Sequence, residues 1–200
     1  MKQLTVISGK GGTGKTTITA ALADLAENKI ICDCDVDAAN MHLLLNPVIK
    51  SEEDITASQV ALINSSECTN CGLCEEHCRF DAVLNNMGSY IIAPIKCEGC
   101  GVCELVCPEN AITMKDRVAG RVYSADTKYG PFIYGKLIPG SGNSGKIVTT
   151  IRKKALELSS QNNAELILID GSPGIGCPVI SSISGTNAAL IVIEPTLSGK

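Results

Sequence analysis

The sequence contains no stretch of apolar residues that approaches the ~18 needed to span a bilayer, so we expect no membrane segment. It also lacks an excess of one charge, because 17 lysines and arginines stand against 21 aspartates and glutamates, for a net charge of −4. This balance gives no general electrostatic reason to expect nucleic acid or an anionic membrane as a partner. Aromatic residues are scarce as well, with no Trp, two Phe and four Tyr.

The beginning of the sequence leaves no room for a signal peptide, because residues 1–4 lead directly into an apolar run. We therefore expect a cytoplasmic protein, in which thiols stay reduced. The 11 cysteines are then better explained as metal ligands than as disulfides. At 200 residues and 44% hydrophobic content, the chain suffices for one core and a small additional module.

A glycine-rich loop follows the apolar run 4–7 and precedes a helical pattern. Gly9, Gly14, Lys15 and Thr16 fit G-x-x-x-x-G-K-[ST], and strand, loop and helix in that order are the context of a phosphate-binding P-loop. The glycines let backbone N–H groups converge on anionic oxygens at the positive end of the helix. In such a loop Lys15 contacts the β- and γ-phosphates and Thr16 binds Mg²⁺. The predicted helix carries an apolar face made of Ile18, Ala21, Leu22, Leu25 and Ala26.

Two further apolar runs end in carboxylates. Residues 29–35 read as a buried strand that ends in Asp33 and Asp35. Residues 165–170 read as another buried strand that ends in Asp170, which is the Walker B pattern. Because open α/β sheets place ligands at the carboxyl ends of their strands, we expect these side chains close to the P-loop.

Other segments carry weaker patterns. Residues 46–59 look like a linker, and residues 120–123 and 131–134 alternate like the two strands of a hairpin. A last parallel strand is expected at 189–196. Because a doubly wound sheet normally continues beyond such a strand, the sequence looks truncated at its C-terminus.

Residues 140–146 nearly repeat the P-loop pattern. Ile147 stands where Ser or Thr would have to bind Mg²⁺, and the residues before the pattern make a poor strand. We therefore predict a turn that leads into a helix with Ser144 as its N-cap, rather than a second nucleotide site. That helix is expected to turn Ile147, Ile151, Ala155 and Leu158 inward.

Eight of the cysteines form an internal repeat. Residues 67–78 and 96–107 each carry Cys-x-x-Cys-x-x-Cys-x-x-x-Cys, at an offset of 29 residues. Three thiolates on one tight loop can hold three corners of a cubane cluster, and the fourth corner must come from elsewhere. Zinc is the competing metal, but a zinc module closes its four ligands locally. The doubled run resembles that of bacterial two-cluster ferredoxins.

In such ferredoxins each remote cysteine serves the other cluster. The resemblance therefore implies two ligand sets, each for one 4Fe–4S cluster. These sets are Cys68, Cys71, Cys74 and Cys107 for the first cluster, and Cys97, Cys100, Cys103 and Cys78 for the second. One departure is that Pro108 follows the second run, whereas Arg79 replaces the usual proline after the first.

The P-loop contains an early lysine, Lys10, in the run Lys-Gly-Gly-Thr-Gly-Lys-Thr-Thr. This run resembles the deviant P-loop of the MinD/Mrp/ParA and nitrogenase-iron-protein superfamily, in which the early lysine reaches the nucleotide of the partner subunit. The resemblance implies a homodimer when ATP is bound. It also implies that Asp35 orients the attacking water and that Asp33 supports Mg²⁺ and its waters. In the second switch segment, Asp170 would hold a water on Mg²⁺ and the Gly174 amide would sense the γ-phosphate.

These observations predict an α/β fold, namely a parallel-sheet, MinD-like P-loop NTPase with an inserted α+β ferredoxin-like domain. We place the two parts of the ATPase domain at 1–59 and 118–200, and the ferredoxin domain at 60–117. The predicted catalytic residues are Lys10, Lys15, Asp35 and Asp170. The predicted nucleotide-binding residues are Gly9, Lys10, Gly11, Gly12, Thr13, Gly14, Lys15, Thr16, Thr17 and Gly174. The predicted Mg²⁺ site consists of Thr16, Asp33 and Asp170.

The predicted function is ATP hydrolysis coupled to electron transfer, with ATP, Mg²⁺ and two 4Fe–4S clusters as cofactors and a redox protein as partner. A cluster carrier or assembly ATPase is one alternative, but carriers need labile clusters shared between subunits, whereas these ligands form closed sets. A MinD/ParA-like positioning ATPase is another, but the sequence has neither an amphipathic membrane tail nor a basic DNA-binding face. Cys177 is expected to be a thiol without a cluster.

Overall fold

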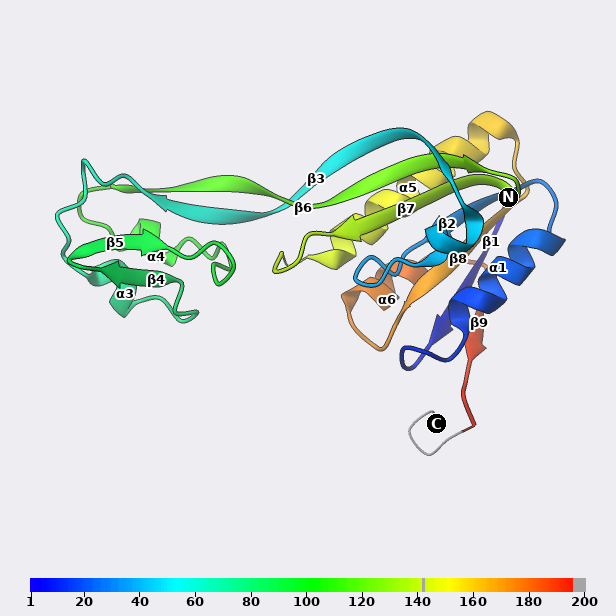
Figure 1. Ribbon diagram of the computed structural model, residues 1–200, viewed down its shortest axis with the longest axis horizontal. Coiled ribbons are helices and arrows are strands. Elements are labelled where there is room, and N and C mark those ends of the chain that lie inside the picture. The colour runs from blue at the N-terminus through cyan, green and yellow to red at the C-terminus, as the bar shows by residue number, and fades with distance from the viewer. Residues whose placement is uncertain (142, 196–200) are drawn as a thin grey trace. The chain divides into compact units, whose positions relative to one another are not determined.

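The computed structural model describes residues 1–141 and 143–195 (Figure 1). These described residues form two compact units. The first, which we call the core unit, comprises the described parts of Met1–Ile55, Gly120–Leu137 and Asn143–Lys200. The second, which we call the insert unit, comprises the described parts of Thr56–Ala119 and Ile138–Gly142.

The main sheet is mixed but mostly parallel, with the strand order β3-β6-β7-β2-β8-β1-β9 among the described residues. β2 pairs in parallel with β7 and β8, β1 pairs in parallel with β8 and β9, and β6 runs antiparallel to β7. The strands are β1 Lys2–Ser8, β2 Lys29–Asp33, β3 Val48–Ile63, β6 Ile112–Thr127, β7 Gly130–Leu137, β8 Leu166–Pro173 and β9 Ala188–Val192. The predicted α/β class with a largely parallel sheet is thereby confirmed.

Helices cover both faces of this sheet in the core unit (Figure 1). On one face, the long helix α5 (Ser144–Asn162) buries Ile147, Ile151 and Ala155, as predicted, and Leu158 packs partly buried against the same cluster. On the other face, α1 (Lys15–Leu25) and α2 (Met41–Leu45) contribute to a second cluster. Successive residues of the central strand β2 point to opposite faces of the sheet and enter both clusters. Such a strand needs apolar side chains on both faces, so its sequence is a continuous apolar run.

The predicted helix after the glycine loop is confirmed, but its predicted apolar face is not the buried one. α1 buries Lys15, Thr19 and Ala23, whereas Leu25 on the predicted face is 78% exposed. Residues four apart share one side of a helix. Lys15 and Thr19 both hydrogen bond to Asp170 in the sheet, and Ala23 packs in the second cluster, so the inward side of α1 combines polar with apolar contacts.

The prediction of a linker at residues 46–59 is wrong, because most of that segment belongs to β3. Arg121 of β6 pairs with Glu52 at 3.2 Å and with Asp54 at 2.6 Å on this neighbouring strand. β3 is the edge strand of the sheet and is exposed along most of its first half. Charged side chains therefore stand where a buried strand has apolar ones, which removes the pattern that marks a strand.

The predicted hairpin is confirmed, since β6 and β7 are antiparallel with Tyr123 opposite Tyr134. The helix after the hairpin is also present, but its N-cap is Asn143 in the left-handed conformation, with φ of 74°, rather than Ser144. Residue 142 of the near-P-loop pattern and residue 196 of the predicted last strand lie outside the described residues.

The insert unit repeats itself in structure at the same offset as in sequence. α3 (Leu73–Glu76) and α4 (Val102–Leu105) are single helical turns, and each follows a glycine in the left-handed conformation. These glycines are Gly72 with φ of 82° and Gly101 with φ of 77°. Between the two helical turns lies a hairpin of β4 (Val83–Asn86) and β5 (Ser89–Ile92).

Two equivalent hydrogen bonds connect the repeats to each other. Asn64 N donates to Ala111 O at 2.7 Å, and Ala93 N donates to Ala82 O at 2.7 Å. Each residue of the first bond lies 29 positions from its counterpart in the second, and each bond joins one repeat to the other. The two repeats are therefore interlocked halves with approximate two-fold symmetry, rather than two separate modules.

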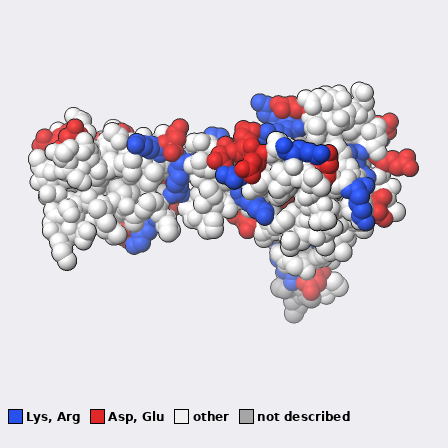
Figure 2. Space-filling model, turned by 45° about the horizontal axis from the view of Figure 1, so that its top comes forward, with Lys and Arg blue, Asp and Glu red and all other residues white. Residues whose placement is uncertain are grey.

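None of the described helices is long and apolar enough to cross a membrane. On the face drawn in Figure 2, basic and acidic side chains of the described residues are interspersed, and neither sign covers a broad area. The net charge of −4 is thus spread out rather than concentrated on that face.

Candidate functional site

The glycine loop joins β1 to α1 and leaves space around its backbone. A Cβ atom on Gly9, Gly11, Gly12 or Gly14 would meet no described atom within 4 Å. Gly12 and Gly14 have φ of 81° and 89°, values that residues with side chains rarely adopt. Thr13 Oγ1 is buried in the same loop without a hydrogen-bond partner among the described residues. Open backbone at a helix N-terminus, beside an unsatisfied hydroxyl, is the arrangement of an anion-binding site.

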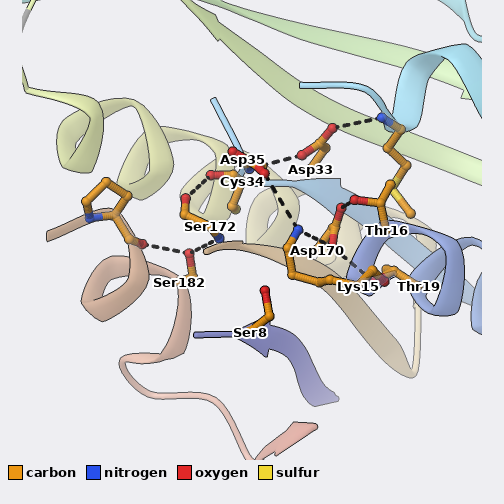
Figure 3. A network of polar contacts seen from close by, with 12 residues as sticks. Ser8, Lys15, Thr16, Thr19, Asp33, Cys34, Asp35, Asp170, Ser172 and Ser182 are labelled. Carbon is orange, nitrogen blue, oxygen red and sulfur yellow. Dashed lines mark hydrogen bonds and ion pairs between the residues drawn. The ribbon is translucent and has the colours of Figure 1, made fainter. Parts of the chain in front are cut away.

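Lys15 and Asp170 form the centre of the site (Figure 3). Lys15 Nζ lies 2.7 Å from Asp170 Oδ1 and 3.8 Å from Asp35 Oδ2. Thr16 Oγ1 donates to Asp170 Oδ2 at 2.7 Å, and Thr19 Oγ1 donates to Asp170 Oδ1 at 3.1 Å. Both Lys15 and Asp170 are buried. One carboxylate thus collects three donors, which compensate for its removal from water.

The two predicted carboxylate strands are neighbours, with Asp33 of β2 opposite Asp170 of β8. The side chain of Asp33 accepts hydrogen bonds from the backbone N–H of Asp35 at 3.0 Å and of Met41 at 3.2 Å. These bonds hold the loop after β2 against the end of its strand. The structure therefore brings Lys15, Thr16, Asp33, Asp35 and Asp170 together at the carboxyl end of the sheet (Figure 3).

Burial governs the protonation of this cluster. Burial, and next to it the neighbouring Asp170 carboxylate, raise the pKa of Asp33 to about 8, although the N–H of Asp35 and the charge of Lys15 oppose the rise. Burial also raises the pKa of Asp35, again against the effect of Lys15. A cation bound here would favour the ionised carboxylates, because it would offset both their burial and their mutual repulsion.

The stability of the protein without nucleotide is expected to fall as the pH rises from about 4 to about 8. In this range folded Asp33, with its pKa of about 8, keeps a proton that the unfolded chain releases near 3.8. Folding thus takes up protons, and the free energy of unfolding decreases by at most about 1.4 kcal/mol per pH unit. Asp33→Asn is expected to flatten this pH dependence in chemical denaturation series.

The slope, rather than the absolute stability, is the quantity to compare, because an amide at position 33 accepts only one of the two backbone N–H bonds. Asp37→Asn is the matched control, since Asp37 lies on the same segment but is exposed. A slope that is the same in Asp33→Asn as in the unchanged protein would contradict the assignment to Asp33.

Two other predicted residues contact protein groups near the loop. The Gly174 N–H, predicted to sense the γ-phosphate, donates to Ser8 O at 3.0 Å, and Gly174 has φ of 89°. Lys10 Nζ, predicted to reach a partner subunit, lies 2.5 Å from Glu194 Oε2, and these side chains are 33% and 43% exposed. The structure thus places both residues at the edge of the site but bonded within the chain.

Sequence analysis missed several polar residues of the network. Thr19 lies four residues after Lys15 and therefore on the same side of the predicted helix. This spacing is the sequence signal that could have placed Thr19 in the site. Ser172 Oγ donates to Cys34 O at 2.6 Å, and Ser182 Oγ donates to Pro178 O at 2.7 Å (Figure 3). Nothing in the local sequence marks these two serines, because their partners are distant backbone carbonyls or lie within a short helix.

The eight repeat cysteines line two separate pockets of the insert unit. The first pocket is lined by Cys68, Cys71, Cys74 and Cys107, with Tyr90 and Ile112 among its other residues. The second is lined by Cys78, Cys97, Cys100 and Cys103, with Phe80 and Val102 among its other residues. Each pocket thus combines three cysteines of one repeat with the remote cysteine of the other.

The remote cysteines have equivalent surroundings. Cys78 Sγ accepts the backbone N–H of Ala82 at 3.4 Å, and Cys107 Sγ accepts that of Ala111 at 3.3 Å. Within the part of the chain that the structure describes, no group of three or more His, Cys, Asp or Glu side chains is arranged to hold a single metal ion.

The remaining cysteines belong to the core unit. Cys32 and Cys34 are fully buried in a hydrophobic cluster, and burial raises the pKa of Cys32 to about 12. Burial likewise raises the pKa of Cys34. Both residues are accordingly protonated packing residues, whereas Cys177 is exposed at the start of α6 (Cys177–Ile183).

A glycine loop at a helix N-terminus, with two carboxylate-ending strands beside it, defines a P-loop nucleotide-binding protein. Residues 4–191 match the family model described as the CobQ/CobB/MinD/ParA nucleotide binding domain. The chain belongs to this family. The match includes both the P-loop and the strand that ends in Asp170, and it extends across the cysteine repeat.

Two relatives from Methanocaldococcus jannaschii extend this finding. The chain is 40% identical over 199 residues to the uncharacterized protein MJ0578, covering 98% of this chain and 68% of that protein. It is 29% identical over 209 residues to the uncharacterized protein MJ0579, covering all of this chain and 71% of that protein. The chain therefore spans about two thirds of the length of these relatives.

Among solved structures, the chain is similar to the septum site-determining protein MinD from Pyrococcus horikoshii OT3, complexed with Mg-ADP. The TM-score is 0.46 at 18% identity, and the alignment covers 99% of this chain and 60% of that chain. The apo structure of McdA from Cyanthece gives a TM-score of 0.46 at 17% identity, with 100% and 60% coverage. In both cases the chain spans less than two thirds of the matched structure.

Proposed function

We propose that this chain is an ATP-hydrolysing iron–sulfur protein in which the nucleotide state controls electron transfer to a redox partner protein. The observation that carries the proposal is the partition of eight cysteines into two pockets of four, within a unit inserted into a nucleotide-binding domain. Each pocket has the ligand composition of one 4Fe–4S cluster in a two-cluster ferredoxin.

The chemistry of the cysteine pockets fits iron–sulfur clusters better than zinc. Zinc bound by four thiolates at about 2.3 Å would draw all four sulfur atoms around a single point. A cubane cluster instead takes three thiolates from one tight loop and a fourth from elsewhere, which is the composition of each cysteine pocket. Backbone N–H groups directed at Cys78 and Cys107 would stabilise ligating thiolates, and hydrogen bonds to sulfur also tune cluster potentials.

When bound, each cluster would supply a one-electron centre. The chain's own contribution is to hold the thiolates in place and to limit solvent access. Cys74 is buried, and Ala61, Val83 and Ile112 form the apolar cluster around it. The predicted ligands Cys71 and Cys100 are exposed, so each proposed centre has one side open to a partner.

In the proposed ATPase, Lys15 neutralises the β- and γ-phosphates, and Thr16 binds Mg²⁺ through its hydroxyl. Asp170 holds a water on Mg²⁺, Asp33 supports the ion, and Asp35 orients the attacking water. In this structure Lys15 and Thr16 both donate hydrogen bonds to Asp170. Bound nucleotide would replace these bonds, because Lys15 would then contact phosphate and Thr16 would bind Mg²⁺. The glycines and Thr13 of the loop would supply the remaining contacts to phosphate.

Lys10 is proposed to contact the nucleotide of a second subunit when ATP is bound. Its ion pair with Glu194 is partly exposed, and such pairs contribute only about 0–1 kcal/mol. The phosphate groups of a nucleotide carry more negative charge than one carboxylate. Formation of an ATP-bound homodimer could therefore draw Lys10 away from Glu194 at small cost.

The course of the chain provides a route for coupling between nucleotide and clusters. Val36, in the segment after Asp33, accepts a hydrogen bond from Leu137 N at 3.0 Å. Leu137 is the last residue of β7 and directly precedes residues 138–142 of the insert unit. The same segment continues through α2 into β3, which also enters the insert unit. A nucleotide-dependent shift after β2 would therefore act on two connections to the insert.

An iron–sulfur cluster carrier is the second candidate. The exposure of Cys71 and Cys100 favours it, because a cluster must be reached to be transferred. Against it, four ligands from one chain close each proposed site, whereas a carrier that shares its cluster between subunits leaves ligand positions open. The experiment that tests electron transfer against this alternative is an anaerobic redox titration with and without MgATP.

A further inference from the structure

We propose that Ser172 is a positioning residue that orients the Asp33–Asp35 segment for ATP hydrolysis and connects this segment to α6. The inference rests on the proposed ATPase activity. Ser172 contacts neither the glycine loop nor Lys15 in any hydrogen bond of the described network. Its effect on catalysis would therefore pass through the backbone that carries Asp35.

The orientation of Ser172 follows from an irregularity in β8. Val6 and Ser8 of β1 pair with Asp170 and Pro173, so β8 contains one residue more than β1 over this stretch. Such a bulge redirects side chains and is frequent beside active sites. A Cβ atom on Gly171 would lie 2.9 Å from Val6 O, so the close approach of the two strands requires glycine there.

The side chain of Ser172 holds the end of β2. It is 3% exposed, and its Oγ donates to Cys34 O at 2.6 Å. On the other side of the same residue, Cys34 N donates to Asp170 O at 2.8 Å. Cys34 is thereby fixed by β8 through both its N–H and its C=O, and it stands between Asp33 and Asp35 in the chain (Figure 3).

The backbone N–H of Ser172 turns toward α6. It donates to Ser182 Oγ at 3.5 Å, and Ser182 Oγ donates in turn to Pro178 O at 2.7 Å. Ser182 is fully buried, and Thr5 Oγ1 donates to its carbonyl oxygen at 3.1 Å. Ser172 therefore bonds to the residue after β2 with its side chain and to α6 with its backbone.

This double attachment has a mechanical consequence. The Gly174 N–H, two residues later, donates to Ser8 O and is predicted to sense the γ-phosphate. A shift of the 171–174 segment would pull on Cys34 through the Ser172 hydroxyl and on α6 through the Ser172 N–H. Ser172 thus links the two segments that are predicted to respond to nucleotide, and it extends that response to α6.

The test is Ser172→Ala in the full chain, followed by two independent readouts. The expected kinetic result is a kcat for ATP hydrolysis lower by about tenfold, with the KM for MgATP within about twofold, because small misplacements of a water-orienting group act on the chemical step. The expected structural result is faster amide hydrogen exchange across residues 33–40 without nucleotide. Ser172→Thr keeps the hydroxyl and is expected to restore both values.

Ser159→Ala is the matched control. Ser159 is a buried serine, 1% exposed, and its Oγ donates to the carbonyl of Leu156 at 2.7 Å within α5. Its replacement removes the same kind of bond away from the site and should leave kcat and exchange at 33–40 unchanged. Equal losses in both variants, or normal kcat and exchange in folded Ser172→Ala, would overturn the proposal. If the unchanged protein hydrolyses no ATP, the proposed function fails, while hydrogen exchange still tests the role of Ser172.

Discussion

Replacing Cys68 by alanine in anaerobically prepared protein is expected to remove one iron–sulfur centre and leave the other. The unchanged chain should contain about eight iron atoms, four for each 4Fe–4S cluster, and the variant about four. Cys97→Ala should also retain about four, but it should lose the other centre, because the two cysteines line different pockets. Iron and sulfide analysis and electron paramagnetic resonance of the reduced variants would distinguish the two losses.

The remote cysteines make this test sharper. Cys107→Ala is expected to give the spectrum of Cys68→Ala, and Cys78→Ala that of Cys97→Ala, since each pair shares a pocket. Cys177→Ala, which removes an exposed cysteine outside both pockets, should keep all the iron. Zinc in place of iron, or Cys107→Ala resembling Cys97→Ala, would contradict the proposed ligand sets.

Replacing Lys15 by glutamine is expected to reduce ATP hydrolysis by roughly 100- to 1,000-fold, which is the range for loss of one group that stabilises transition-state charge. Lys15 is the first residue of α1, and its ammonium group already lies between Asp170 and Asp35. The positive charge of Lys15 is therefore already in place before a nucleotide phosphate binds. Steady-state phosphate release by the purified variant is the measurement.

The same change also removes a partner from buried Asp170, and breaking a buried ion pair costs about 3–5 kcal/mol. Melting temperature must therefore be measured alongside activity, and Thr16→Val provides a second variant that keeps Lys15 in place. Hydrolysis at normal rates in folded Lys15→Gln would rule out the P-loop as the catalytic site.

Lys10→Gln is the matched variant in the same loop. It removes one positive charge, as Lys15→Gln does, but from a partly exposed pair rather than from a buried one. We expect normal stability together with loss of both nucleotide-dependent dimerisation and fast hydrolysis. A Lys10→Gln variant that dimerises and turns over ATP normally would show that Lys10 does not act across a dimer.

The core of the fold could be predicted because its determinants are local. The P-loop occupies consecutive positions between a strand and a helix, and the buried strands ending in Asp33 and Asp170 are marked by unbroken apolar runs. Parallel strands align their carboxyl ends, so the meeting of these carboxylates with Lys15 followed from the fold class. The resemblance of the cysteine repeat to two-cluster ferredoxins likewise predicted which thiols would share a pocket.

What could not be predicted depends on contacts between distant residues. The buried side of α1 includes Lys15 and Thr19, which hydrogen bond to Asp170 about 150 positions away in the chain. The edge strand β3 pairs with β6, and its Glu52 and Asp54 form ion pairs with Arg121 of that strand. Because these positions carry charged side chains, the sequence of β3 shows no alternation of apolar and polar residues. The attachment of Ser172 to Cys34 depends on a bulge that only the paired strands reveal.

In the proposed function, nucleotide binding and the redox state of the clusters influence each other. Because coupling between sites is reciprocal, MgATP that changes a cluster's reduction potential must also bind the oxidised and reduced proteins with different affinity. A potential shift of about 59 mV in a one-electron couple corresponds to a tenfold change in the equilibrium constant for reduction, or about 1.4 kcal/mol. This value lies within the typical ~1–3 kcal/mol of coupling free energy between two sites.

The most direct measurement is an anaerobic redox titration of the clusters in the full-length protein, with no nucleotide, with MgADP and with MgATP. We expect MgATP to shift at least one cluster potential by tens of millivolts relative to the nucleotide-free protein, and Lys15→Gln to abolish the shift. Identical potentials under all three conditions, together with equal ATP affinities of the oxidised and reduced protein, would contradict this expectation.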